Sequence, residues 1–185
     1  MSALLGVYDR DLLLVSGKGC RLFDKEGRSY LDFAAGIGVN GLGYGDRATL
    51  AAIREQSKRL AHASNLFLAE PVVALAERLV ALAFKAKVFF TNSGAESNEA
   101  AIKFARKVGR REGRSELVAF EGSFHGRTLG ALSLTWNPKY REPFEPLLPG
   151  VRFCRWRDLA AASDTIGAKT AAVFARDGSG VVRLY

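Results

Sequence analysis

The sequence predicts an α/β fold in which parallel strands alternate with helices, and three observations support this prediction. Short apolar runs typical of buried strands stand at residues 87–91, 116–120 and 170–174. Segments with apolar residues at helical spacing lie between these runs, and glycine or proline marks most of the boundaries. A chain of 185 residues with 48% hydrophobic residues is also large enough to bury the core of such a fold.

The N-terminal part is expected to hold a hairpin and two helices. Residues 20–33 alternate apolar and polar side chains around a turn at 24–27, which indicates two antiparallel strands. A glycine-rich passage, 34–45, follows. Asp46 is placed to cap the next helix, and Pro71 is well suited to the first turn of a second, largely apolar helix.

The remaining elements alternate between the two types. Residues 87–91 predict a strand, 92–94 a turn and 95–108 a helix. After the strand at 116–120 we expect, in order, a loop at 124–130, a third short strand at 130–135, an irregular proline-rich connection at 137–150, a helix at 160–166 and a buried strand at 170–174.

The net charge of +8, from 27 basic and 19 acidic residues, raises nucleic-acid binding as an alternative. No zinc-finger spacing, aromatic RNA-binding block or basic-zipper heptad accompanies the charge. The densest basic stretch falls at the expected end of the helix at 95–108, where cations complement the helix dipole. We therefore expect no nucleic-acid partner. That stretch consists of Lys103, Arg106, Lys107, Arg110, Arg111 and Arg114.

Membrane insertion, secretion and metal binding are not expected. No apolar run approaches the roughly 20 residues of a membrane-spanning helix. Charged residues at 9–11 interrupt the region where a signal peptide needs an apolar stretch. The two cysteines and two histidines are scattered, so neither a metal site nor a disulfide framework is indicated.

Two glycine-containing segments suggest ligand binding, and the evidence for the second is stronger than for the first. Gly36, Gly38 and Gly41 fit the dinucleotide pattern GxGxxG, but no helix opens directly on them, so dinucleotide binding is disfavoured. Ser93 and Glu96 have the spacing of a capping box at the start of a helix. The small residues between them leave backbone amides open to a phosphate at the positive end of the helix dipole, although many helices begin in this way and bind nothing.

A second cluster, SFHGRT at 123–128, follows the next strand and is expected at the same carboxyl edge of the sheet. Phe124 could stack on a flat heteroaromatic ring, although burial in the core is the commoner use of such a residue. Arg127 could hold a carboxylate bidentately. His125 has no partner set for nucleophilic catalysis in the sequence and is interpreted as a supporting group of the site.

At these residues the sequence resembles the class III pyridoxal-phosphate-dependent aminotransferases, in particular their acetylornithine branch. The resemblance runs through four stretches in order: YLDFAAGIGVNGLGYGD at 30–46, VFFTNSGAESNEAAIKFARK at 88–107, SFHGRTLGALSLT at 123–135 and PFEPLLPGV at 143–151. It implies pyridoxal phosphate as cofactor. It also implies the transfer of the terminal amino group of N-acetylornithine to 2-oxoglutarate, in arginine biosynthesis.

The resemblance also implies roles for individual residues. Gly94 and Ala95 match the family's backbone clamp for the cofactor phosphate, and Phe124 matches the residue stacked on the pyridine ring. Arg127 matches the residue that binds the substrate α-carboxylate. The expected cofactor-binding set is Ser93, Gly94, Ala95, Phe124 and His125, and the expected substrate-binding set is Arg127 and Asn40.

The resemblance further implies an incomplete fold of the aspartate-aminotransferase type, fold type I, in a family of homodimers. Residues 1–61 are expected to be a small-domain and linker segment, and 62–174 the first part of the cofactor-binding, parallel-sheet large domain. Residues 175–185 depart from the family. No lysine of the chain matches the family's Schiff-base lysine and no aspartate matches the pyridine partner, so we expect no catalytic residue and no activity from this chain alone.

Three questions stay open at this point. The chain could instead act as a non-catalytic interaction module that pairs with full-length subunits. Within the family, ornithine, succinylornithine and 4-aminobutyrate are alternatives to acetylornithine as amino donor. The compartment is unknown, with a plastid or the mitochondrial matrix slightly favoured over a bacterial-type cytoplasm.

Overall fold

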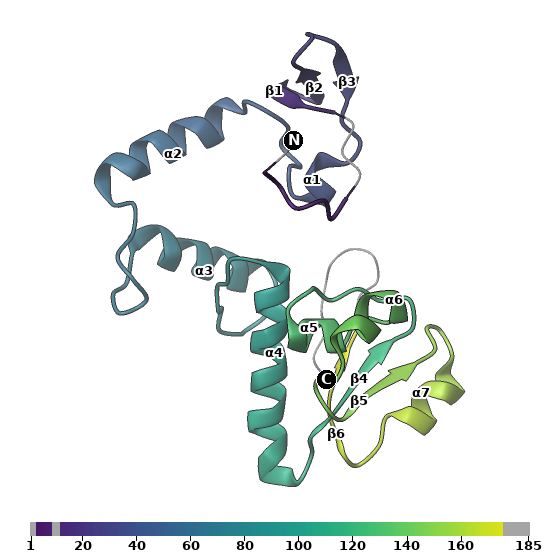
Figure 1. Cartoon of the computed structure of the whole chain (residues 1–185). Helices are drawn as coiled ribbons and strands as arrows, with labels where there is room; N and C mark the ends of the chain where they lie inside the picture. Colours follow the sequence, from purple (N-terminus) through teal and green to yellow (C-terminus); the bar gives the residue numbers. More distant parts are fainter. Residues whose placement is uncertain (1–2, 9–11, 176–185) are drawn as a thin grey trace. The chain divides into compact units, whose positions relative to one another are not determined.

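The computed structural model describes residues 3–8 and 12–175 of the chain. They form two compact units, one up to Leu82 and one from Ala83 onwards, and each is described by itself (Figure 1). The expected division into domains at residue 61 stays a prediction, and the tail from residue 176 lies outside the described residues.

The N-terminal unit contains a three-stranded antiparallel sheet. Its strands, in the order in which they pair, are β1 (Leu14–Lys18), β2 (Arg21–Asp24) and β3 (Ser29–Leu31). The expected hairpin at 20–33 is therefore confirmed as β2 and β3. Sequence reasoning missed β1, which pairs with the other side of β2.

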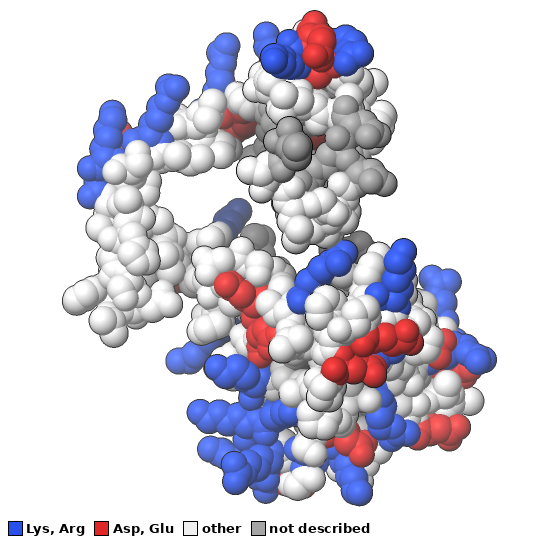
Figure 2. Space-filling model, in the orientation of Figure 1, with Lys and Arg blue, Asp and Glu red and all other residues white. Residues whose placement is uncertain are grey.

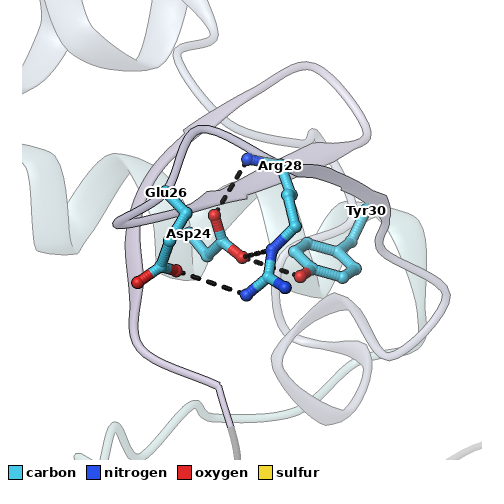
Figure 3. Close-up of polar contacts among 4 residues, drawn as sticks. All are labelled: Asp24, Glu26, Arg28 and Tyr30. Atoms are coloured by element: carbon cyan, nitrogen blue, oxygen red, sulfur yellow. Dashed lines mark hydrogen bonds and ion pairs between the residues drawn. The ribbon is translucent and has the colours of Figure 1, made fainter.

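A buried aspartate fixes the turn of this hairpin (Figure 3). Asp24 is only 2% exposed, and its carboxylate accepts hydrogen bonds from Arg28 N (2.9 Å), Arg28 Nε (2.7 Å) and Tyr30 Oη (2.7 Å). Burial by itself would raise the pKa of the Asp24 carboxyl, but the bonds from Tyr30 and Arg28 outweigh it and lower the pKa to about 2. Glu26 adds an exposed contact to the same guanidinium.

The glycine-rich passage that follows is a loop, interrupted by the short helix α1 (Ala35–Gly38). Gly36 and Gly38 have positive φ angles of 62° and 82°, and no long helix starts on them. This geometry removes the dinucleotide-binding interpretation. The loop is tied back to the sheet by Tyr44, whose hydroxyl donates to Asp32 (2.7 Å) and whose backbone pairs with Gly19.

Two helices complete this unit, α2 (Arg47–Arg59) and α3 (Glu70–Leu82). Asp46 caps α2 as expected, because its carboxylate accepts from Thr49 N (2.8 Å) and Thr49 Oγ1 (2.7 Å). Pro71 lies in the first turn of α3, where a missing amide hydrogen is tolerated.

The C-terminal unit is built on a parallel sheet with the strand order β5, β4, β6, as the predicted fold class requires (Figure 1). The strands are β4 (Glu116–Phe120), β5 (Val151–Cys154) and β6 (Thr170–Phe174). Successive residues of β4 point to opposite faces. Leu117 and Ala119 pack with Ile102 of α4 (Gly94–Gly109), whereas Val118 packs on the side of α7 (Leu159–Thr165).

Three expectations for this unit were wrong or incomplete. Residues 87–91 are not a strand: no described segment pairs with them, and Phe89 is 64% exposed. The expected strand at 130–135 is instead the short helix α5 (Leu129–Ser133), closed by a bond from Leu132 N to Thr128 O (2.7 Å). Strand β5 was not expected. The proline-rich connection includes α6 (Pro138–Arg141) and a 3₁₀ turn, η2 (Glu142–Phe144).

Basic side chains gather over the C-terminal end of α4 and the 3₁₀ turn η1 (Arg110–Glu112) that follows it (Figure 2). Arg106 and Lys107 occupy the last turn of the helix, where positive charge complements the dipole. Among the helices of the described residues, none has both the length and the apolar character needed to cross a bilayer.

Candidate functional site

The N-terminus of α4 is the first part of the candidate site. Ser93 caps the helix, since its Oγ accepts from Glu96 N (3.2 Å). The carboxylate of Glu96 accepts from Asn92 N (2.6 Å), one residue earlier than a capping box requires. Within the described chain the amides of Gly94 and Ala95 donate no hydrogen bond, as is usual for the first residues of a helix. They are therefore available to an anion.

Space in front of these amides is open. A Cβ atom built on Gly94 would meet no heavy atom within 4 Å, and Gly94 is solvent-exposed. α4 is long, 16 residues, so its dipole favours negative charge at this end. A phosphate group fits the donor set by chemistry, because two uncommitted amides and the positive end of a helix meet at the same point.

The second part of the site is the loop between β4 and α5, which lies against α4. Asn98 Nδ2 of α4 donates to the carbonyl of His125 (2.6 Å), in a buried hydrogen bond. Gly126, with a φ of 137°, packs so closely that an added Cβ would lie 2.8 Å from Ala95 Cβ. Thr135 Oγ1 accepts from His125 N (3.0 Å). The first two turns of α4 thus hold the loop directly.

One further α4 side chain reaches the loop after Arg127. A single oxygen of Glu99, Oε1, accepts from Thr128 Oγ1 (2.6 Å) and from Ala131 N (3.1 Å). The second of these bonds satisfies an amide in the first turn of α5, which would otherwise lack a partner within its helix. The start of α5 is therefore specified by a residue about thirty positions earlier in the chain.

An aromatic and cationic cluster stands at the solvent side of this loop. The guanidinium of Arg127 lies over the ring of Tyr140 in α6, 4.7 Å from its centroid, and 6.0 Å from the centroid of Phe124. The rings of Phe124 and Tyr140 meet edge to face at 6.3 Å. Phe124 is 38% exposed, so part of its surface can take a flat ligand, and Arg127 is exposed.

The structure brings most of the predicted site residues into one unit. Ser93, Gly94 and Ala95 are joined to the loop of Phe124 and Arg127 through contacts of α4. His125 lies in the same loop, but its side chain is buried, 2% exposed, and its ring packs against Phe174 at 6.0 Å. Asn40 belongs to the N-terminal unit, where it lines a hollow of about 340 Å³ with Gly41 and Asp46.

Sequence reasoning missed Asn98, Glu99 and Tyr140. A helical signal for the first two was present, because they stand three and four residues after Ala95 and so share its face of α4. Tyr140 lies in the proline-rich connection, where no periodic pattern indicated its position. A hollow of about 740 Å³ along α4 is lined by Phe89, Lys103 and Phe104, but it includes none of the predicted ligand-binding residues.

The comparison with known proteins assigns the family. The sequence profile of the family described as "Aminotransferase class-III" matches residues 7–175. The chain belongs to the class-III aminotransferases. It is 50% identical over 190 aligned positions to "Acetylornithine aminotransferase, mitochondrial" of Alnus glutinosa, covering 98% of this chain and 42% of that protein. It is 44% identical to "Succinylornithine transaminase" of Yersinia pseudotuberculosis, covering 88% of this chain and 42% of that protein.

Solved structures agree with this assignment. An ornithine aminotransferase from Toxoplasma gondii matches with a TM-score of 0.88 at 25% identity, over 98% of this chain and 45% of that chain. An (S)-enantioselective omega-transaminase from Thermomicrobium roseum matches with a TM-score of 0.86 at 31% identity, over 98% of this chain and 49% of that chain. A further structure of the Toxoplasma enzyme is described with PLP at its active site. The chain spans less than half the length of these relatives.

Proposed function

We propose that this chain provides the phosphate-binding and carboxylate-binding part of a pyridoxal-phosphate-dependent aminotransferase that acts on N-acetylornithine and 2-oxoglutarate. One observation carries the proposal. The uncommitted amides of Gly94 and Ala95 and the loop of Phe124 and Arg127 are held on the first two turns of α4. Membership of the class-III aminotransferases and the 50% identity to an acetylornithine aminotransferase support the choice of cofactor and substrate.

Each residue has a defined task in this proposal. The amides of Gly94 and Ala95, with Ser93 fixing the start of the helix, hold the cofactor phosphate. Phe124 stacks on the cofactor ring, and Arg127 binds the substrate carboxylate through two parallel hydrogen bonds. His125 supports the loop from the core side. Pyridoxal phosphate, when bound, supplies the electron sink for the transfer of the amino group.

A negative charge introduced at Gly94 tests the phosphate site. An aspartate there places a carboxylate in open space beside the two amides, and a helix N-terminus tolerates it, so the fold is retained. We expect Gly94→Asp to weaken the binding of pyridoxamine phosphate at least tenfold, because like charges repel. Gly94→Asn, of the same shape but neutral, should stay within about threefold of wild type.

Pyridoxamine phosphate suits this measurement because it has no aldehyde to react with surface lysines. Binding is followed by the quenching of Trp136 fluorescence. The backbone amide of Trp136 donates to Ser123 O (3.0 Å), which places this tryptophan at the base of the loop. Isothermal titration calorimetry provides a second measurement. Equal affinity in wild type, Gly94→Asp and Gly94→Asn would overturn the phosphate assignment.

The chain alone is proposed to be inactive in transamination, since no residue in it matches the family's Schiff-base lysine. Purified 185-residue protein mixed with N-acetylornithine, 2-oxoglutarate and the cofactor should form no glutamate above a protein-free control. Formation of glutamate that depends on the chain would contradict the proposal directly.

The amino donor is the finer part of the proposal. Asn40 and Arg127 are assigned to acetylornithine, whereas the 44% identity to a succinylornithine transaminase favours the longer acyl group as an alternative. The test uses a protein in which this segment is joined to the remaining part of the class-III fold. Its kcat/KM for N-acetylornithine should exceed that for N-succinylornithine, ornithine and 4-aminobutyrate, and the reverse order would assign one of those donors instead.

A second candidate function, a non-catalytic interaction module, is favoured by exposed apolar side chains in the N-terminal unit. Phe33, Ile37 and Leu68 are each at least 90% exposed, which is unusual for side chains that contact only water. In this alternative the chain pairs with a full-length subunit, and the complete enzyme is a homodimer. Co-expression with a full-length relative, followed by size-exclusion chromatography, should yield a mixed species, and its absence at micromolar concentration would reject the module.

The cellular location is proposed to be organellar, supported by the mitochondrial name of the Alnus relative, with a bacterial-type cytoplasm as the alternative supported by the Yersinia relative. Fluorescence microscopy of the tagged protein in its source cell distinguishes the two.

The division into a small-domain segment at 1–61 and a large-domain segment at 62–174 is likewise a proposal. Limited proteolysis tests it, because cleavage should concentrate near residue 61.

A further inference from the structure

Two consecutive side chains of α4, Asn98 and Glu99, hydrogen-bond to the residues on either side of Arg127. We call this pair of contacts the bracket. On one side of Arg127, Asn98 Nδ2 donates to the carbonyl of His125 (2.6 Å). On the other side, Glu99 Oε1 accepts from Thr128 Oγ1 (2.6 Å). A loop held at a single point can rotate about that point, whereas one held on both sides of a residue cannot. The bracket therefore fixes the direction in which Arg127 leaves the backbone.

Glu99 fits its position closely. A Cβ atom built on Gly130 would lie 2.8 Å from Glu99 Cδ, so a larger residue at this position would require the carboxylate to shift away from the start of α5. The same oxygen also accepts from Ala131 N (3.1 Å). Two donors from different segments converge on one acceptor, so Glu99 joins the loop and α5 to α4 at a single point.

The helix that supplies this bracket is itself fixed. Ile102 and Ala105, further along α4, are buried against the sheet. Ala95 lies four residues before Glu99, about one helical turn or roughly 6 Å along the axis. The amides assigned to the phosphate and the acceptor that holds the arginine loop thus belong to one rigid segment, with no flexible joint between them.

From this arrangement we propose that Glu99 is a positioning residue that couples the two ligand groups. Through Thr128 it holds Arg127 at a fixed distance from the Gly94 and Ala95 amides, so that a ligand seated by its phosphate meets a preformed carboxylate site. The proposal rests on the proposed function, which assigns the phosphate to those amides and the carboxylate to Arg127. Glu99 itself touches neither group.

Loss of the bracket should affect one ligand group only. Without the hydroxyl of Thr128, the residue directly after Arg127 is no longer bound to Glu99, and the remaining bond of Glu99 is to Ala131 N, four residues from Arg127. Asn98 still holds the segment before Arg127. The arginine then samples more orientations, and binding a carboxylate has to restrict them, which weakens binding. The amides of Gly94 and Ala95 stay on the same helix and should bind phosphate as before.

The test compares two ligands on the 185-residue chain. One is the phosphopyridoxyl conjugate of N-acetylornithine, joined through its terminal nitrogen. The other is the same conjugate with the carboxylate converted to a carboxamide. The ratio of their dissociation constants isolates the contribution of the carboxylate. Arg127→Gln should abolish the preference of wild type for the carboxylate form.

Thr128→Val removes the hydroxyl and keeps the shape of the side chain. We expect it to reduce the carboxylate preference about tenfold while the affinity for the carboxamide stays within about threefold. Thr128→Ser restores the hydroxyl and should restore the preference. Ser57→Ala is the control, since Ser57 Oγ also donates a hydrogen bond, to Arg54 O (3.0 Å), but does so on α2 in the other unit.

The outcomes separate the two proposals. If wild type binds neither conjugate, the proposed function fails and the coupling fails with it. If wild type prefers the carboxylate and Thr128→Val keeps the full preference, or loses affinity for both ligands equally, only the role of Glu99 is overturned. Hydrogen exchange of the Ala131 amide in the ligand-free chain adds a check without ligands. Exchange should be faster in Thr128→Val, and an unchanged rate would overturn the bracket.

Discussion

Gly126 offers the sharpest test of how the loop is held on α4. Its φ of 137° lies in the region that L-amino acids rarely adopt, and a Cβ there would lie 2.8 Å from Ala95 Cβ and 3.0 Å from Ala131 Cβ. Both neighbours are alanines on helices, so neither can swing away as a long side chain would. Gly126→Ala therefore combines backbone strain with a clash between backbone-anchored atoms.

The expected loss in the free energy of unfolding is obtained by treating the backbone strain and the clash separately. Strain at a positive φ costs about 1–3 kcal/mol for a residue other than glycine, and forcing extra volume into a packed site costs about 1–3 kcal/mol more. Gly122 has a φ of 78° but open space around its Cβ position, so Gly122→Ala should show the strain alone, about 1–2 kcal/mol. Gly94→Ala has neither problem and should lie within about 0.5 kcal/mol of wild type or be slightly stabilising.

Urea unfolding followed by tryptophan fluorescence measures these differences. Trp136 and Trp156 are the two tryptophans of the chain, and both lie in the C-terminal unit, so the signal reports that unit. We expect a loss in the free energy of unfolding of about 3 kcal/mol or more for Gly126→Ala. Equal losses for Gly126→Ala and Gly122→Ala would refute the argument that the loop packs directly on Ala95.

Three further predictions concern other contacts. Asn98→Leu should lower the free energy of unfolding by about 1–3 kcal/mol, because the buried His125 carbonyl loses its hydrogen-bond donor. The same urea assay measures this loss, and an unchanged free energy of unfolding would mean that water replaces the amide. Ser93→Ala should cost about 1 kcal/mol by removing the cap of α4, and Ser93→Asp, which keeps an acceptor, should cost less. Asp24 has a folded pKa of about 2, below the usual value near 4, so its contribution to stability is complete above pH 4 and is lost as pH falls towards 2. Tyr30→Phe should raise that pKa and move acid unfolding of the hairpin to higher pH, as measured by carboxyl NMR titration, and an unchanged titration would show that Arg28 alone sets it.

Local patterns predicted the elements whose ends are fixed by their own residues. The start of α4 follows from Ser93 and Glu96, the start of α2 from Asp46, and the hairpin from the alternation on either side of its turn. In each case the hydrogen bonds that define the boundary connect residues within a few positions of each other. A sequence pattern is sufficient under that condition.

The errors lie where distant residues decide the structure. Residues 132–135 alternate apolar and polar side chains as in a strand, yet Glu99 satisfies the amide of Ala131 and stabilises a helical turn at 129–133. Residues 87–91 have strand-like composition but no described neighbour to pair with. The same limit applies to the site. Ser93, Gly94, Phe124 and Arg127 stood in recognisable motifs, whereas the bracket formed by Asn98 and Glu99 depends on where the loop comes to lie on the helix.

Surface loops between a strand and a helix commonly change in length as proteins diverge. The loop between β4 and α5 has little of that freedom, because His125, Gly126 and Thr128 are each fitted to a different residue of α4. One inserted residue would shift the chain by up to about 3.5 Å and detach at least one of them. Changes of substrate range in this lineage should therefore arise by exchange of side chains in this loop and by length variation elsewhere.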